Sequence, residues 1–103
     1  MEDNEDKERM DFTKWQSSMV KYMHKKGITF MAGTDTPIGF LVPGLSLHQE
    51  IEELTNSGLT NLEALKAATI NPSKYFNLQD SLGRIKPNFI ADLVILDQNP
   101  LID

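Results

Sequence analysis

The sequence predicts a small, mainly helical α/β domain, and three observations lead to this fold class. Residues 28–32 form a short apolar run with β-branched and aromatic side chains, which is typical of a buried strand. Helical patterns precede and follow this run, as they do in a parallel α/β unit. The chain has 103 residues, which is enough for one small domain.

The composition narrows the classes of partner and location. The net charge is -5, so we expect neither a nucleic acid nor an anionic membrane to bind. The chain has no cysteine, which excludes disulfides and thiolate metal ligands and fits a reducing, cytoplasmic location. No apolar run approaches the roughly 20 residues of a membrane span, and the acidic N-terminal residues do not resemble a signal peptide.

The first part of the chain predicts one amphipathic helix. Residues 1–10 are almost wholly charged or polar, and we expect a flexible acidic lead-in there. From residue 11 to residue 26 apolar side chains recur at helical spacing, and Gly27 follows as a stop signal. His24 is better explained as a cation at the helix end than as a catalytic residue. The apolar positions of this helix include Phe12, Trp15, Met19 and Tyr22.

Asp35 is the main candidate for a functional residue, because it comes just after the predicted strand. In parallel α/β folds, ligands gather outside the carboxyl ends of the strands. The alternative is a structural role, since Asp often begins a turn and Pro37 follows here. Residues 36–45 form an unusually apolar loop, which is either the wall of a pocket or a cover over the core.

Two further helices begin with capping-box patterns. Ser46 precedes Gln49 by three positions, and the helix that follows ends before Gly58. Thr60 precedes Glu63 in the same way and opens a third helix. In a capping box each of the two side chains accepts a hydrogen bond from the backbone of the other residue.

The last part of the chain predicts a short helix and then two strands. Asn71 suits the cap of the helix, and Pro72 suits its first position. Two short strands, around Ile85 and over residues 93–96, predict an antiparallel hairpin. Its turn is Pro87-Asn88, where Asn tolerates a left-handed backbone.

An ordered series of motifs runs from about Gly27 to Leu101. Its members are GTDTP at 33–37, PG at 43–44, LHQE at 47–50, GLT at 58–60, EAL at 63–65, AATINPSKY at 67–75, LGRI at 82–85, ADLVILD at 91–97 and NPL at 99–101. In this order they resemble the last third of the metal-dependent amidohydrolases. The imidazolonepropionase-like branch is the most similar one.

The resemblance implies a (β/α)8 barrel with a small composite β-sandwich. On this map residues 28–32 are the last barrel strand, residues 11–80 the C-terminal part of the barrel, and residues 81–103 strands of the sandwich. Asp35 matches the family's strand-end aspartate, which binds the metal and takes a proton from the attacking water. A carboxylate in that position can pass the proton to the leaving nitrogen.

Other motifs of the family have no counterpart in this chain. The His-x-His pair, the bridging lysine or acid and two later histidines are missing, since the chain has only His24 and His48. A catalytic zinc normally needs three protein ligands. We therefore expect zinc or another divalent metal and a small-molecule substrate in the full-length enzyme. This chain alone is expected to be a fragment that binds no metal tightly and is inactive.

Three hypotheses about function remain. The first is a piece of a hydrolase that acts on carbon–nitrogen bonds in cyclic amides, dipeptides or other non-standard peptides. The second is a non-catalytic, helical interaction module. The third is a small metal site built from Asp35, His48 and Glu50, which is disfavoured because His48 and Glu50 do not share a helix face. We also expect the chain to self-associate, because its strand edges and apolar helix face are left uncovered.

Overall fold

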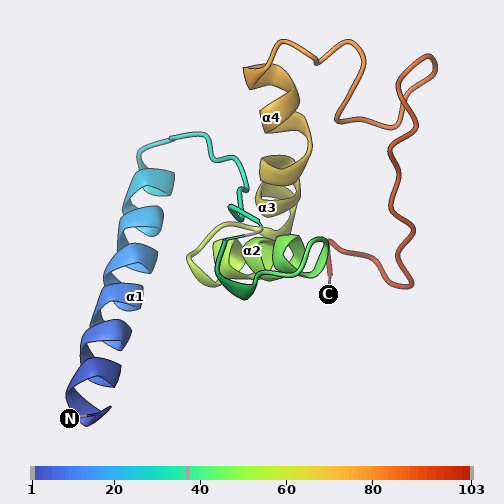
Figure 1. The fold of residues 1–103 in the computed structure, drawn as a ribbon. Coiled ribbons are helices and arrows are strands. Elements are labelled where there is room, and N and C mark those ends of the chain that lie inside the picture. The colour runs from blue at the N-terminus through green and yellow to red at the C-terminus, as the bar shows by residue number, and fades with distance from the viewer. Residues whose placement is uncertain (1, 37, 103) are drawn as a thin grey trace.

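A helical body with two arms makes up the structure, a computed structural model that describes residues 2–36 and 38–102. The body consists of helices α2 to α4, over residues 45–75. Helix α1 forms one arm, and the C-terminal segment, residues 83–102, forms the other on the opposite side of the body (Figure 1). The radius of gyration is 15.9 Å, against about 13 Å for a compact domain of about this length, because both arms project. The elements are α1 (Glu2–Lys25), the 3-10 helix η1 (Ile38–Phe40), α2 (Leu45–Asn56), α3 (Asn61–Ala68) and α4 (Ile70–Tyr75).

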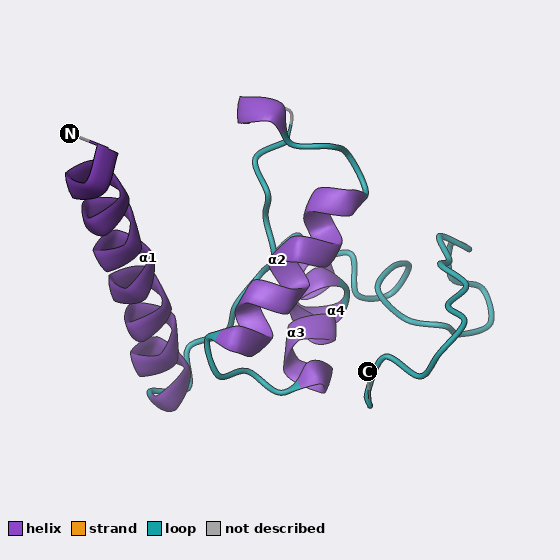
Figure 2. Ribbon diagram, turned by 90° about the horizontal axis from the view of Figure 1, so that it is seen from below, coloured by secondary structure: helices purple, strands orange, loops and turns teal. Residues whose placement is uncertain are grey.

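No β-strand is present among the described residues, which form helices and loops (Figure 2). The mainly helical character is thus confirmed, whereas the strand predicted over residues 28–32 is wrong for this structure. The predicted C-terminal hairpin is also absent, although its turn forms. The backbone NH of Phe89 donates to the Lys86 carbonyl at 3.1 Å, and Asn88 has a φ of 68°. A strand is stabilised by a ladder of hydrogen bonds to a second strand, and neither segment has such a neighbour within residues 2–36 and 38–102.

Helix α1 begins at Glu2, well before residue 11, where the apolar pattern predicted its start. The acidic residues 2–10 therefore continue the helix, since Glu and Lys are good helix formers. The predicted glycine stop is confirmed, because Gly27 has a φ of 77° and the NH of Ile28 donates to the Met23 carbonyl at 3.2 Å. No helix in the described part of the chain combines the length and the apolar character that a membrane crossing requires.

One of the two predicted capping boxes forms. The Thr60 hydroxyl accepts the backbone NH of Glu63 at 3.3 Å, and the Glu63 carboxylate accepts the backbone NH of Thr60 at 2.8 Å. The box predicted at Ser46 is wrong, because α2 begins at Leu45 with Gly44 as its N-cap and no side-chain cap. Ser46 lies inside the first turn of α2 and is buried, so its hydroxyl turns to tertiary partners.

The cap predicted at Asn71 is wrong for the same reason. Helix α4 begins at Ile70 and has Thr69 as its N-cap. The amide of Asn71 instead donates to the backbone carbonyl of Phe30 at 2.8 Å. The side chain of Asn71 could have capped its own helix, but it bonds to a segment that is far away in the sequence.

The hydrophobic core lies where α2, α3 and the loop between them meet. Ala64 and Ala67 of α3 are both 0% exposed, since their small side chains allow the neighbouring backbone to approach closely. The set of buried apolar side chains is small, so a large part of the apolar side chains lies outside it. Its members are Leu54, Leu59, Ala64 and Ala67, with Val20, Phe30, Ala32 and Ile51 packed against them.

Candidate functional site

Asp35 lies in a tight turn directly after residues 28–34, which are neither helix nor paired strand. Its carbonyl accepts a hydrogen bond from the NH of Ile38 at 2.9 Å, and its φ of 53° is left-handed. Asp is one of the few residues besides Gly that adopts this conformation at modest cost. The residue is exposed to solvent. The backbone of Asp35 therefore forms the turn, while its side-chain carboxylate remains exposed to solvent.

Three hydroxyls surround this turn and tie it to helix α2. The hydroxyls of Thr34 and Thr36, on either side of Asp35, lie 2.7 Å apart. The Thr36 hydroxyl is 2.9 Å from that of Ser46, which is only 4% exposed and donates to Thr34 Oγ1 at 3.4 Å. We call Thr34, Thr36 and Ser46 the hydroxyl cluster. Because it bonds both neighbours of Asp35 to a buried helix position, it fixes the orientation of the turn.

The segment before the turn is held by the end of α3. The NH of Ala32 donates to the carbonyl of Ala67 at 2.9 Å. Ala67 is in the last turn of α3, where carbonyls have no partner within the helix, so this bond satisfies both groups. Together with the bond from Asn71 to Phe30, it aligns residues 30–32 beside the junction of α3 and α4.

The metal site proposed from Asp35, His48 and Glu50 is not formed. Within residues 2–36 and 38–102, no three side chains of the His, Cys, Asp or Glu type come together closely enough to hold a metal ion. His48 instead lines a groove to which Asp35 does not contribute. This third hypothesis is therefore wrong.

The groove runs between helices α2 and α3 and the C-terminal residues 92–100, and its volume is about 730 Å³. Residues 38–42 of the apolar loop do not line it, so this part of the loop is no wall of this pocket. No sequence pattern marks the groove, since its two sides are more than twenty residues apart in the chain. Its apolar side chains are Leu47, Ile51, Leu65, Ala68, Val94, Leu96 and Pro100.

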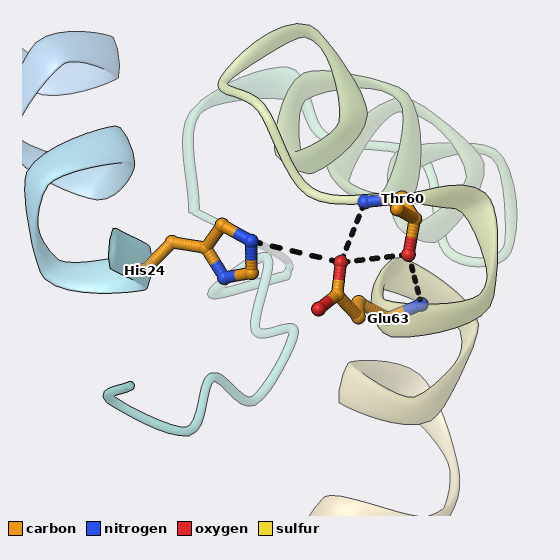
Figure 3. Close-up of polar contacts among 3 residues, drawn as sticks. All are labelled: His24, Thr60 and Glu63. Carbon is orange, nitrogen blue, oxygen red and sulfur yellow. Dashed lines mark hydrogen bonds and ion pairs between the residues drawn. The ribbon is translucent and has the colours of Figure 1, made fainter. Parts of the chain in front are cut away.

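A second polar cluster joins α1 to α3 (Figure 3). His24 Nε2 lies 3.6 Å from Glu63 Oε2, and the same oxygen accepts the hydroxyl of Thr60 at 2.6 Å. Hydrogen bonds from the Thr60 side chain and backbone hold the pKa of Glu63 below its ordinary value of 4.5, and nearby His24 and Lys66 act in the same direction. His24 lies in the last turn of α1, as its sequence position predicts, and it also contacts another helix.

A model of the Amidohydrolase family matches residues 13–103, which include Asp35, the hydroxyl cluster and both sides of the groove. The chain belongs to the amidohydrolase family. The coarse resemblance read from the ordered motifs is thereby confirmed.

Several curated amidohydrolase relatives align with this chain. Ochratoxinase of Aspergillus niger is 37% identical over 81 residues, which are 77% of this chain and 16% of that protein. An adenine deaminase of Thermosipho melanesiensis is 41% identical over 51 residues, or 50% of this chain and 9% of that protein. Adenine deaminase 3 of Rhizobium meliloti is 30% identical over 83 residues, or 77% and 14%. The chain thus spans 16% or less of the length of these relatives. The comparison with solved structures gives no match.

Proposed function

We propose that the chain is part of a metal-dependent hydrolase that cleaves carbon–nitrogen bonds. One observation carries this proposal. Asp35 directly follows a non-helical apolar segment, is fixed by the hydroxyl cluster, faces solvent and lies inside the region that the family model matches. The names of the relatives support the reaction class, since a deaminase breaks a carbon–nitrogen bond.

Asp35 is proposed as the proton carrier of the reaction. Its carboxylate accepts a proton from the attacking water as the water oxygen bonds to carbon. It then gives that proton to the leaving nitrogen as the carbon–nitrogen bond breaks. The hydroxyl cluster supports this role because it restricts the turn and so fixes the direction of the carboxylate.

Amidohydrolases generally use a divalent metal such as zinc, and we propose that Asp35 supplies one oxygen ligand to it. The residues described here do not fit a whole catalytic centre, because that needs three protein ligands and no group of three was found among them. The remaining ligands are proposed to come from residues outside this sequence. By itself the 103-residue chain is therefore proposed to be inactive.

The finer assignment is also part of the proposal. We infer an imidazolonepropionase-like enzyme built on a (β/α)8 barrel, in which residues 28–32 pair as a strand once a neighbouring strand is supplied. Both this segment and residues 93–96 are free of helix in the part of the chain that the structure describes, which supports this. The substrate class is a small molecule such as a cyclic amide, a dipeptide or another non-standard peptide.

A second candidate function is a non-catalytic interaction module. It is favoured by the exposed aromatic side chains of α1, among them Trp15, which is 56% exposed. The two candidates differ in what they require of Asp35, because only the hydrolase needs its carboxylate.

The test is the change Asp35→Asn in a full-length protein that carries this sequence. Asn tolerates the left-handed turn as Asp does, so folding should be preserved while hydrolysis falls by about 10²–10⁴, the usual value of a general acid–base step. Asp80→Asn, a matched change at another exposed acid, should leave the rate unaltered. An Asp35→Asn enzyme that hydrolyses substrate at the wild-type rate would reduce Asp35 to a turn residue.

A further inference from the structure

The junction of α3 and α4 is a break in what would otherwise be one helix. Thr69 is both the C-cap of α3 and the N-cap of α4, and its φ of -133° and ψ of -77° are not helical. Pro72 explains the break, because proline has no backbone NH and its ring collides with the carbonyl four residues earlier, here that of Ala68. The sequence therefore places the break shortly before Asn71.

The break separates two residues that an unbroken helix would bond to each other. In a continuous helix the carbonyl of Ala67 would accept the backbone NH of Asn71. Instead, the Ala67 carbonyl accepts the NH of Ala32 at 2.9 Å. The side-chain amide of Asn71 donates to the Phe30 carbonyl at 2.8 Å. Both residues of the junction thus bind the same short segment, residues 30–32.

The side chain of Asn71 acts on this segment and not on its own helix. Helix α4 has no side-chain cap, and the bond from Asn71 reaches a residue 41 positions earlier in the chain. Phe30 and Ala32 are also packed against the core. Two hydrogen bonds at positions two residues apart fix both the place and the rotation of the backbone between them.

Asp35 follows this segment after two residues, and its turn is held again on the other side. There the Thr36 hydroxyl lies 2.9 Å from that of Ser46 in α2. The backbone that carries the carboxylate is therefore held before the turn by the junction of α3 and α4, and after it by α2. Before the turn, Asn71 contributes a side chain, so its share can be removed by substitution.

We propose that Asn71 is a positioning residue for Asp35, which acts through the Phe30 carbonyl on the backbone from which the carboxylate projects. This inference rests on the proposed role of Asp35 as the proton carrier. A displacement of a reacting group by about 1 Å can lower a rate by about 10²-fold, even when its cause lies far from the chemistry. Loss of the amide donor should thus slow the reaction without weakening substrate binding.

The first test uses a full-length protein that carries this sequence, with a dipeptide or cyclic amide that the wild type cleaves. Asn71→Ala should lower kcat by about 10- to 100-fold and leave KM nearly unchanged. Added to Asp35→Asn, it should lower kcat no further, because the position of the side chain matters only while its carboxylate acts. Asn61→Ala, the same change at the half-buried asparagine that opens α3, is the control and should leave kcat unaltered.

The outcomes separate this inference from the function on which it rests. If Asp35→Asn hydrolyses the substrate at the wild-type rate, the proposed function is wrong and the inference with it. If Asp35→Asn is slow, the positioning role alone is wrong in three cases. These are an Asn71→Ala enzyme with the wild-type kcat, one in which KM rises instead, and a double variant in which the two losses multiply.

Amide hydrogen exchange of the 103-residue chain gives a readout that needs no catalysis. Asn71→Asp keeps the size of the side chain but replaces the donor by an acceptor, so it should repel the Phe30 carbonyl. The NH of Ala32 should then exchange about 10-fold faster. The NH of Ala64, which donates to the Thr60 carbonyl at 2.9 Å, should keep its rate. Equal acceleration at both amides, or an unchanged rate at Ala32, overturns the proposal.

Discussion

The body of the molecule and its C-terminal arm contrast in where their backbone and apolar groups find partners. In the body, Ala64 and Ala67 are fully buried, and the capping box at Thr60 satisfies the start of α3. In the arm, Ile95 is 96% exposed, and residues 93–96 are not helical and have no paired strand among residues 2–36 and 38–102. Helices satisfy their own backbone, so the body forms from this sequence alone. Extended segments need a second strand, so the arm keeps the pattern of a sheet without its contacts.

The largest expected effect separates these two regions directly. Leu54→Ala leaves a cavity in the small core and should lower the free energy of unfolding by about 2–5 kcal/mol. Ile95→Ala, in the arm, should change it by no more than about 0.5 kcal/mol. Urea unfolding followed by circular dichroism measures both. Equal losses in the two variants would mean that the arm packs as tightly as the body.

A second prediction concerns the root of the arm at Gly83. Its φ is +83°, and an added Cβ would lie 2.7 Å from both Ser73 Oγ and the Thr69 carbonyl. Gly83→Ala should therefore lower the free energy of unfolding by about 2–5 kcal/mol, the sum of left-handed backbone strain and overpacking. At Gly39, φ is +63° but nothing lies within 4 Å, so Gly39→Ala should cost only the strain, about 1–2 kcal/mol. If both changes lower the free energy of unfolding by the same amount in urea, the arm is not anchored at Gly83.

The smallest effect is a pH dependence of the body. The pKa of Glu63 is lower in the folded chain than its ordinary value of 4.5, chiefly because the Thr60 side chain donates to it. Its contribution to stability is therefore present above pH 4.5 and is lost as the pH falls through the lowered pKa. In Glu63→Gln this part of the acid dependence should disappear from the urea midpoints. A variant as acid-sensitive as the wild type would assign the dependence to other carboxylates.

The sequence predicts the parts of this fold that depend on neighbours along the chain. The stop at Gly27 and the capping box of Thr60 and Glu63 are such features, and both are confirmed. Ser46 and Asn71 were misjudged as caps because their side chains bond to Thr36 and Phe30, which are distant in sequence. The strand over residues 28–32 failed because its conformation depends on a partner strand.

The candidate site also has one feature that depends on neighbours along the chain and one that depends on residues distant in sequence. Asp35 is a candidate because it follows the apolar run, and the end of such a run is visible in the sequence. The hydroxyl cluster was missed, since nothing local pairs Ser46 with Thr34 and Thr36. The only available signal was the pair of threonines that flank Asp35.

The hydroxyl cluster also determines where its protons point. Each hydroxyl can donate only one hydrogen bond. Since Ser46 donates to Thr34, the bond between Thr36 and Ser46 must be donated by Thr36, and that between Thr34 and Thr36 by Thr34. The three bonds thus form a closed, one-directional ring in which every hydroxyl hydrogen is used. None is left to donate to the carboxylate of Asp35, so that group stays open to donors that approach from solvent.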